Sequence, residues 1–366
     1  MRRARADPRG SVGVSPLERD PREADLLDAE RAVAAQVGAA DAVAPVGTGT
    51  HREVGGPPPA GVEVRAPVGV VMYDPAELTV TVGAGTTVEE LSGILSEANQ
   101  ECVLDPRDAT ATIGGTLACG LSGLRRLRYG PLRDRVLEVR FATAAGELVR
   151  GGGPTVKNVT GYDMPRLLVG SFGTLGVLTR VVLRCQPRPM HAQWGHTSDD
   201  PATVLARSFR ASAVLWDGAR TSVLSEGHPD DVVSQIATLG LEAQEGPPPV
   251  PVGAHRGRAS VAPADVIAVG RSLDAIVGAR WIAEAGVGTL HVACDEESTL
   301  ADARQAVTQH GGWLLREEGA PGLDGFGVEL PNAALMARVK TAFDPTNKLA
   351  AGRLPLAPRE DARIAS

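Results

Sequence analysis

Two glycine-rich segments contain residue types that could bind an anion. The first, Val46-Gly-Thr-Gly-Thr50, follows a short apolar stretch and is succeeded by Gly55 and Gly56. Glycine lets the backbone turn sharply and bring several N–H groups against one anion, so the loop could cradle a diphosphate. The alternative is an ordinary flexible connection, because short Gly-X-Gly matches are common.

The residues after this loop exclude two common nucleotide-binding motifs. Thr50 is followed by His51-Arg-Glu-Val and then by prolines, where a Rossmann fingerprint requires the start of a helix. The loop does not match the Gly-rich, Lys-containing P-loop either.

The second glycine-rich segment runs from Gly161 to Val177 and reads GYDMPRLLVGSFGTLGV. Lys157-Asn158 precedes it, a turn of helix is expected through Arg166-Leu-Leu168, and a strand is expected to follow the last glycine. Between the two segments, residues 110–120 read TATIGGTLACG. Small side chains and adjacent glycines there would let a flat ring system lie against the backbone, although close helix packing explains them equally well.

In order and spacing these segments resemble the FAD-binding domain of p-cresol methylhydroxylase and vanillyl-alcohol oxidase type flavoproteins, over Asp25 to Pro189. The run VKNVTGYD at 156–163, with GTLGV at 173–177, is similar to the FAD-binding E subunits of bacterial glycolate oxidases. The stretch FDPTNKLAAGRL at 343–354 resembles the closing motif of the same group. The resemblance implies that FAD is the cofactor and that these residues bind it: Val46, Gly47, Thr48, Gly49, Thr50, Thr112, Gly114, Gly115, Thr116, Gly120, Tyr129, Gly161, Tyr162, Gly173, Thr174, Gly176 and Val177.

Some relatives attach the flavin covalently to a histidine directly after the second glycine of the first loop. That position is Thr50 in this chain, and His51 comes one place later. The resemblance therefore implies non-covalent FAD.

The residues that would oxidise a substrate are not evident in the sequence. Relatives that oxidise D-2-hydroxy acids carry a stretch of the form HxGDGNxH in the second lobe, and this chain has none. His291 is the one histidine in a plausible inward setting, and a lone strand histidine is usually structural. The basic tract over Arg125 to Arg135 could hold an anionic substrate or an acidic partner, or it could be a solvated loop; Arg128 and Tyr129 lie where relatives approach the flavin. The catalytic residues stay unknown.

The resemblance leaves three functions open. The first is an FAD-binding subunit of a glycolate oxidase-like 2-hydroxy-acid dehydrogenase complex, with a sister flavoprotein subunit and an iron-sulfur subunit as partners. The second is a stand-alone FAD-dependent oxidase or dehydrogenase of another alcohol or hydroxy acid. The third is a non-catalytic flavin-binding assembly subunit. A reductase of UDP-N-acetylenolpyruvoylglucosamine shares the FAD domain class, but the serine and glutamate that it needs cannot be placed.

Composition limits the partners. The net charge is 37 minus 44, or −7, which argues against a nucleic-acid surface. No stretch approaches the roughly 20 apolar residues that a transmembrane helix needs, so we expect a cytoplasmic protein, at the inner face of the membrane through partners. The four cysteines show no metal-site spacing and are expected to be reduced and structural; no metal is expected.

The elements that position the glycine segments are predicted as follows. Helix formers behind an acidic start predict a helix over Asp25 to Val37, and overlapping capping boxes at Thr86 and Thr87 predict another that ends at Asn99. Residues 246–258 are expected to form an exposed loop, and no internal repeat is evident. Strands are expected at 42–46, 68–72, 78–82, 102–104, 136–143, 148–150, 175–185, 214–216, 222–224, 290–293 and 313–315, and helices at 230–239 and 298–309.

These elements and the resemblance together predict an α+β protein. A two-subdomain FAD-binding domain of the p-cresol methylhydroxylase type would be followed by a smaller α/β sandwich as the second lobe. The expected divisions are a disordered leader over 1–24, the FAD-binding domain over 25–189, a second (cap) lobe over 190–340, and a C-terminal segment over 341–366 that returns to the FAD domain and ends in a disordered tail. The proline-rich Gln186-Pro-Arg-Pro189 marks the main boundary.

Overall fold

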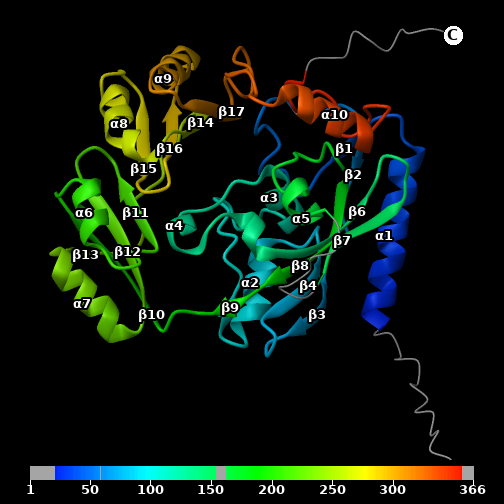
Figure 1. Cartoon of the computed structure of the whole chain (residues 1–366), viewed down its shortest axis with the longest axis horizontal. Helices are drawn as coiled ribbons and strands as arrows, with labels where there is room; N and C mark the ends of the chain where they lie inside the picture. Colours follow the sequence, from blue (N-terminus) through cyan, green and yellow to red (C-terminus); the bar gives the residue numbers. More distant parts are fainter. Residues whose placement is uncertain (1–20, 58, 154–161, 357–366) are drawn as a thin grey trace, which may run out of the picture.

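The computed structural model describes residues 21–57, 59–153 and 162–356. Two large antiparallel sheets form two lobes; the chain passes between them near β9 (Gln186–Pro187) and again between β17 (Trp313–Glu318) and α10 (Ala333–Phe343), and further contacts lie around α4 (Arg126–Tyr129) (Figure 1). The first lobe holds both glycine-rich segments, and the second holds most of the chain after residue 190.

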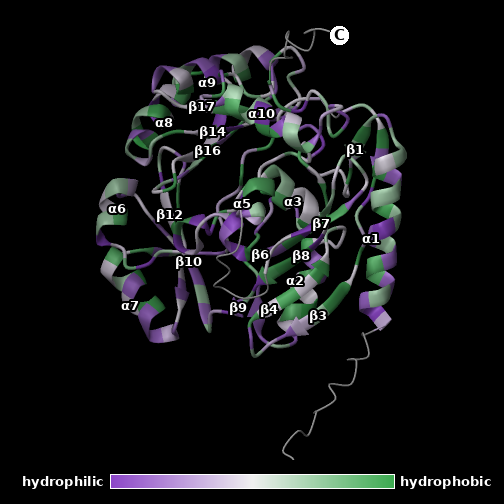
Figure 2. Cartoon of the chain, turned by 45° about the vertical axis from the view of Figure 1, so that its right-hand side comes forward, coloured by the Kyte–Doolittle hydropathy of each residue, from purple (hydrophilic) through white to green (hydrophobic). Residues whose placement is uncertain are grey.

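The first lobe is built on a five-stranded sheet in which long-range pairing brings β8 (Val177–Arg184) to the centre. Seven of the eight residues of β8 are buried, and it pairs with β4 (Thr79–Gly83) on one side and β6 (Val136–Ala142) on the other. Figure 2 shows the hydrophobic colouring of β3 and β8. The strand order is β3 (Val70–Asp74), β4 (Thr79–Gly83), β8 (Val177–Arg184), β6 (Val136–Ala142) and β7 (Leu148–Gly152).

Helices cover this sheet where the sequence supplies caps and apolar faces. In α2 (Val88–Ser96), Thr87 and Glu90 form the predicted capping box, and Leu91 and Leu95 are buried. The other capping residue that was predicted, Thr86, instead accepts a hydrogen bond from the Gly69 amide at 2.8 Å. The remaining helical segments of this lobe are α3 (Ile113–Cys119), α4 (Arg126–Tyr129), η1 (Leu132–Arg135) and α5 (Met164–Leu168).

A smaller subdomain flanks the sheet. Strands β1 (Val43–Pro45) and β2 (Val62–Val64) pair in parallel, and helix α1 (Pro21–Ala39) packs beside them and against β6 and β8. Glu30, fully buried on α1, accepts hydrogen bonds from Arg180 at 2.7 Å and from Thr179 at 3.0 Å, both on β8. This buried ion pair ties α1 to the sheet.

The C-terminal segment returns to this subdomain. After α10 (Ala333–Phe343), Leu349 forms a parallel bridge with Val43 of β1. Lys348 Nζ donates to the carbonyls of Val37, Gly38 and Ala40 at the end of α1, which the helix itself leaves without partners.

The second lobe contains an eight-stranded antiparallel sheet with helices on the side away from the first lobe (Figure 1). Each half has the order β-α-β-β-α-β, and in each half the first and third strands are central. The first half is β10 (His191–Thr197), α6 (Pro201–Arg207), β11 (Ala213–Trp216), β12 (Thr221–Gly227), α7 (Pro229–Leu239) and β13 (Glu242–Gln244). The second half is β14 (His255–Ser260), α8 (Val266–Asp274) after η2 (Pro263–Asp265), β15 (Arg280–Glu284), β16 (Thr289–Cys294), α9 (Glu297–Gln309) and β17 (Trp313–Glu318).

Four expectations are corrected by this structure. Helix α1 begins at Pro21, so residues 21–24 belong to it and not to the leader, whose other residues lie outside the described part of the chain. The strand expected at 102–104 is not formed; β5 (Gln100–Glu101) precedes it and pairs with β9 (Gln186–Pro187). Residues 255–258 are not a loop but part of β14, whose partners β16 and β17 satisfy its polar backbone. The second lobe is an internal repeat of topology, which the sequence does not reveal.

Candidate functional site

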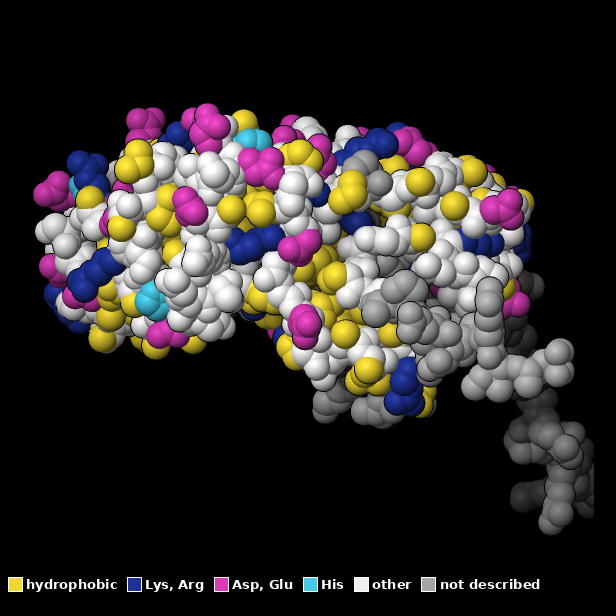
Figure 3. Space-filling view, turned by 90° about the horizontal axis from the view of Figure 1, so that it is seen from above, with side chains coloured by type: hydrophobic (Ala, Val, Ile, Leu, Met, Phe, Trp, Pro, Cys, Tyr) yellow, Lys and Arg dark blue, Asp and Glu magenta, His cyan; other side chains and the backbone are white. Residues whose placement is uncertain are grey.

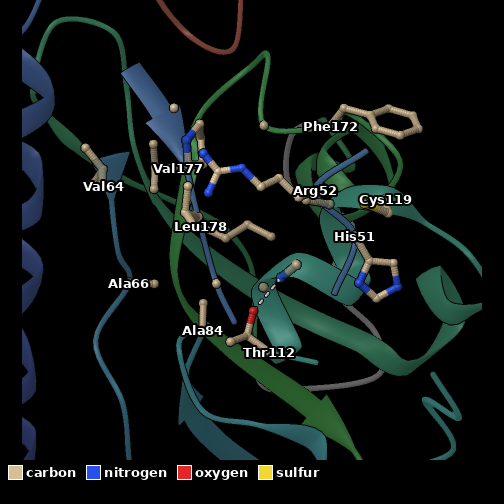
Figure 4. Close-up of a pocket in the computed structure, with 18 of the residues that line it drawn as sticks. His51, Arg52, Val64, Ala66, Ala84, Thr112, Cys119, Phe172, Val177 and Leu178 are labelled. Carbon is tan, nitrogen blue, oxygen red and sulfur yellow. Dashed lines mark hydrogen bonds between the residues drawn. The ribbon is translucent and has the colours of Figure 1, made fainter. Parts of the chain in front are cut away.

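A long cleft lies between the small subdomain and the five-stranded sheet, and both glycine-rich segments line it. Its walls come from residues 44–52, from Val64 of β2, from the residue pairs 84–85 and 114–115, from residues 171–173 and 176–178, and from Arg353. Apolar side chains including Val64, Ala84 and Leu178 form one side (Figure 4). The chain thus brings segments that are distant in sequence around one cleft.

The loop after β1 presents a row of unpaired amides to this cleft. None of the described residues accepts a hydrogen bond from the backbone N–H groups of residues 47–50, whereas the neighbouring Val46 amide bonds to Val64 O at 2.9 Å. Gly49 has φ +93° and faces open space, so a Cβ there would meet no described atom within 4 Å. Successive free amides form a concave anion site, and phosphate oxygens are suitable acceptors.

Thr112 joins this loop to the opposite wall. It caps α3, and its Oγ1 accepts a hydrogen bond from the Gly115 amide at 3.1 Å, the dashed line in Figure 4. Gly47 packs so closely on Thr112 that an added Cβ would lie 2.3 Å from Oγ1. Nearby, Thr48 Oγ1 donates to Thr110 O at 2.9 Å. The glycine at 47 is therefore required by close packing as well as by the turn.

Two arginines of the cleft were not predicted from the sequence. Arg52 reaches across the cleft towards Val177, while His51 points to the opposite side (Figure 4). Arg52 also forms an exposed ion pair with Glu63 at 3.1 Å. Arg353 is buried and donates to the carbonyls of Gly56, Pro57 and His51 at 3.0–3.1 Å, which fixes the segment after the glycine loop. Arg353 lies inside the closing motif at 343–354, and that motif was the sequence signal that could have identified it as a residue of the cleft.

Most of the predicted FAD ligands lie in the lining of this cleft. They are Val46, Gly47, Thr48, Gly49, Thr50, Thr112, Gly114, Gly115, Gly173, Gly176 and Val177. Gly161 lies outside the described residues, as do the neighbouring residues 156–160 of the quoted motif.

Five predicted ligands are not among the residues that line the cleft. Thr116 Oγ1 is buried without a partner among the described residues, and Gly120 is the left-handed C-cap of α3. Thr174 Oγ1 donates to Ser171 O at 2.7 Å, and Tyr162 is 91% exposed. Tyr129 lies between the lobes, where its hydroxyl donates to Glu226 Oε2 at 3.1 Å and burial raises its pKa.

The basic tract connects the two lobes and is not a solvated loop. Arg125 pairs with Asp105 at 2.7 Å and Glu101 at 2.9 Å in the first lobe, and with Glu226 at 3.3 Å in the second. Arg128 donates to Ser212 Oγ at 3.2 Å and also to the Glu226 carbonyl. These contacts determine how the second lobe faces the cleft.

A second cavity of about 560 Å³ opens between the lobes. Thr50 and His51 line both this cavity and the cleft, so the two spaces meet at these residues. His51 Nδ1 lies 2.9 Å from Thr50 Oγ1, and burial lowers the pKa of its imidazole although Glu317 and Asp108 act in the opposite direction. The imidazole at this junction is therefore neutral near pH 7.

Residues from the open face of the second sheet form the far wall of this cavity. His291, expected to face inward, is buried, and its Nε2 lies 2.7 Å from Glu284 Oε1. Arg256 and Arg258 on β14 line the same wall. The inward position of His291 is confirmed, and its partner Glu284 was not predicted.

Other sequence expectations concern groups away from the cleft and cavity. All four cysteines are free and buried; Cys119 lines the cleft, and burial raises its pKa to about 12. Acidic and basic side chains are interspersed on the face seen in Figure 3. Within the described ranges, no cluster of three or more His, Cys, Asp or Glu could hold a metal ion. No helix in the described part of the chain is both long and apolar enough to cross a bilayer.

Comparison with known proteins agrees with this geometry. Residues 24–152 match the family described as FAD binding domain. Glycolate oxidase subunit GlcE of Escherichia coli (strain K12) is 45% identical over 130 residues, which are 35% of this chain and 37% of that protein. D-lactate dehydrogenase of Archaeoglobus fulgidus is 39% identical over 29% of this chain and 24% of its own length. The matched segments thus span about a quarter to two fifths of these relatives.

Among solved structures, alkyldihydroxyacetonephosphate synthase superposes with a TM-score of 0.63 at 15% identity, over 89% of this chain and 74% of that one. This likeness extends the shared fold across both lobes. It agrees with the predicted α+β class, in which an FAD-binding domain of the p-cresol methylhydroxylase type precedes an α/β sandwich. Residues 24–152 are therefore similar to FAD-binding domains of this type, and the comparisons indicate FAD as the cofactor.

Proposed function

We propose that this chain is the FAD-binding subunit of a glycolate oxidase-like 2-hydroxy-acid dehydrogenase complex and that it holds FAD non-covalently. The observation that carries the proposal is the row of four free amides at residues 47–50 beside the Thr112 cap. The similarity to a glycolate oxidase subunit and to a D-lactate dehydrogenase supports the substrate class.

Each wall of the cleft has a role in this proposal. The loop over Val46 to Thr50 cradles the diphosphate, and Arg52 supplies a cation that can leave its exposed pair with Glu63. Residues 112–116 and Gly120 approach the flavin and ribityl chain. The adenine and phosphate side is completed by Gly161, Tyr162, Gly173, Thr174, Gly176 and Val177, and Tyr129 stays a proposed contact near the flavin.

The fit to FAD rests on shape as well as donors. Gly49 leaves open space where a side chain would otherwise fill the cleft, and the apolar wall around Val64 and Leu178 excludes water. When bound, FAD supplies a two-electron acceptor that no amino-acid side chain provides. The protein positions that group and joins its cleft to the cavity between the lobes.

The proposed domain divisions follow from the same organisation. The FAD-binding domain comprises residues 21–189, because α1 begins at Pro21, and it is followed by the second (cap) lobe over residues 190–340 and the C-terminal segment over residues 341–366. The eight-stranded sheet lies wholly within 191–318, and Lys348 and Arg353 attach the last segment to the first lobe.

The complex is proposed to include a sister flavoprotein subunit and an iron-sulfur subunit that accepts electrons. Glycolate oxidase subunit GlcD of Bacillus subtilis (strain 168) is 36% identical over 33% of this chain and 26% of its own length, and it represents the type of sister subunit that we propose. We propose a cytoplasmic location, at the inner face of the membrane through these partners.

Reconstitution tests the proposal. The purified chain is expected to carry or take up one equivalent of FAD that acid precipitation releases, with no flavin left on the His51 peptide after tryptic digestion. Anaerobic glycolate is then expected to bleach the visible flavin absorbance, either for the chain alone or for the chain with its partner subunits. A chain that takes up no FAD, or a flavinylated His51, would contradict the proposal.

A further inference from the structure

The cavity between the lobes contains a buried pair that no part of the FAD cleft uses. His291 on β16 and Glu284 at the end of β15 are 7% and 1% exposed, and His291 Nε2 lies 2.7 Å from Glu284 Oε1. The second polar atom of each side chain, His291 Nδ1 and Glu284 Oε2, is buried without a hydrogen-bond partner among the described residues.

Such an arrangement is costly unless something completes it. A buried polar atom without a partner costs about 1–3 kcal/mol, and here two occur on one contacting pair. With Glu284 ionised, His291 donates from Nε2 and leaves Nδ1 as a free acceptor, which suits a ligand hydroxyl. Since both residues line the cavity, a molecule that enters it is the available partner.

Two guanidinium groups stand beside this pair. Arg256 and Arg258 are two positions apart on β14, so both side chains project from the same face of the sheet into the cavity. Arg258 donates to Ser122 O at 2.8 Å and lies 3.7 Å from Glu284. Arg256 forms an ion pair with the half-exposed Glu318 through one terminal nitrogen, and its Nε has no partner among the described residues. Guanidinium groups bind carboxylates in a bidentate manner, so the pair of arginines favours an organic acid.

The other charged groups of the cavity are already engaged with one another. Asp105 pairs with Arg125 at 2.7 Å, and Glu317 lies 3.6 Å from Arg107. The apolar part of the lining, which includes Trp194, Leu121 and Leu224, provides contact for a carbon skeleton. The cavity thus combines carboxylate donors, a hydroxyl acceptor and an apolar wall.

We propose that this cavity is a binding site for a small 2-hydroxy or 2-oxo monocarboxylate, with Arg256 and Arg258 on its carboxylate and the His291–Glu284 pair on its α-oxygen. The inference rests on the proposed function, because FAD would occupy the cleft that meets this cavity at Thr50 and His51. It places a substrate site in this chain itself and not only in a sister subunit.

Calorimetric titration with 2-hydroxy-2-methylpropanoate tests the site without turnover, because this 2-hydroxy monocarboxylate has no α-hydrogen to lose. The FAD-loaded full chain is expected to bind one molecule of it and to show a matching change in its visible flavin spectrum. His291→Gln and Arg256→Gln are each expected to weaken binding at least tenfold, since each removes one of the ligand's partners. Arg258→Lys keeps a cation for the Ser122 contact and is expected to weaken binding less than Arg256→Gln.

Two matched variants serve as controls. His196 on β10 also lies beside a glutamate, since its Nε2 is 3.5 Å from Oε2 of Glu242 on the neighbouring strand β13, but it does not line the cavity. Arg280 on β15 is 45% exposed and pairs with Asp295. His196→Gln and Arg280→Gln are expected to leave the affinity for 2-hydroxy-2-methylpropanoate within twofold of the parent.

The outcomes separate this inference from the proposed function. If the chain holds FAD but does not bind 2-hydroxy-2-methylpropanoate, or if the cavity variants bind it as the parent does, the cavity proposal is overturned and FAD binding stands. If the chain holds no FAD, the proposed function fails whatever the titration gives.

Discussion

Replacing Gly47 by alanine perturbs the proposed diphosphate loop at a single carbon. The new methyl group would lie 2.3 Å from Thr112 Oγ1 and 2.9 Å from its Cγ2. Non-bonded atoms need about 3.5 Å, so an overlap of about 1 Å must be relieved. Thr112 cannot turn freely, because its Oγ1 caps α3 through the Gly115 amide. The loop with its free amides is therefore expected to shift away from α3.

The size of the effect follows from this overlap. Overpacking a closely fitted site costs typically 1–3 kcal/mol. If the loop relieves this strain by moving, FAD must restore the strained geometry when it binds, and its affinity falls by about 5- to 150-fold. Because the loop lies at the edge of the cleft, the free energy of unfolding of the apoprotein should change by less than the free energy of FAD binding.

Titration of apoprotein with FAD, followed by flavin fluorescence, measures this loss. Gly93→Ala is the matched control, because Gly93 lies inside helix α2 with no described atom within 4 Å of an added Cβ. It should bind FAD normally and gain roughly 0.5–1 kcal/mol of stability. Adding Thr112→Ala to Gly47→Ala removes the two close atoms and should restore much of the affinity, despite a lost cap. Unchanged FAD affinity in Gly47→Ala would refute the assigned role of this loop.

Four further measurements test other parts of the structure. Glu30→Ala leaves the buried Arg180 with only its longer pair to Glu23 at 3.8 Å and should cost about 3–5 kcal/mol in urea unfolding. Glu23→Ala removes only that longer, partly exposed pair and should cost under about 1 kcal/mol; equal losses would contradict the dominance of the buried pair. Cys119, whose pKa burial raises to about 12, should resist alkylation at pH 8 in the native protein and react in urea; rapid native labelling would contradict its burial. Arg353→Ala frees three carbonyls and should weaken FAD binding at least tenfold, with Arg353→Lys intermediate; retained affinity would show that the segment after the glycine loop needs no such anchor. Burial lowers the pKa of His51, so the unfolded chain binds a proton on this imidazole more readily than the folded chain does. The free energy of unfolding should therefore fall as the pH drops below about 6.5, and it should fall less in His51→Gln. Identical pH profiles of the two proteins in urea unfolding would exclude this contribution.

Local sequence patterns were sufficient for the elements that depend on neighbouring residues. The Thr87–Glu90 box starts α2 as predicted, since both partners lie within one turn of helix, and Asn99 ends that region with φ +53°. The glycine segments and their order indicated an FAD domain because the close approach of backbone to a ligand permits few residue types. Eleven of the predicted FAD ligands line one cleft, although nothing in their own spacing could show that they meet.

The sequence was weakest where a segment's state depends on distant partners. Residues 255–258 follow a proline-rich stretch and looked like a loop, but β16 and β17 on either side make them a central strand. Local propensity says little about such pairing, because strand formation depends on the neighbouring strands. The repeated β-α-β-β-α-β topology is hidden for the same reason, since it lies in strand order and not in residue identity.

By itself, the sequence determined the cofactor domain, because glycines, hydroxyls and their order along the chain reflect local backbone needs. The tertiary structure alone decided which charges meet. It joined Glu30 to Arg180 across 150 positions, engaged the basic tract with Glu226, and placed Glu284 beside His291 at the wall of a second cavity. The burial and pairing of these charged groups arise from strand pairing and from packing between elements, which local residue patterns do not specify.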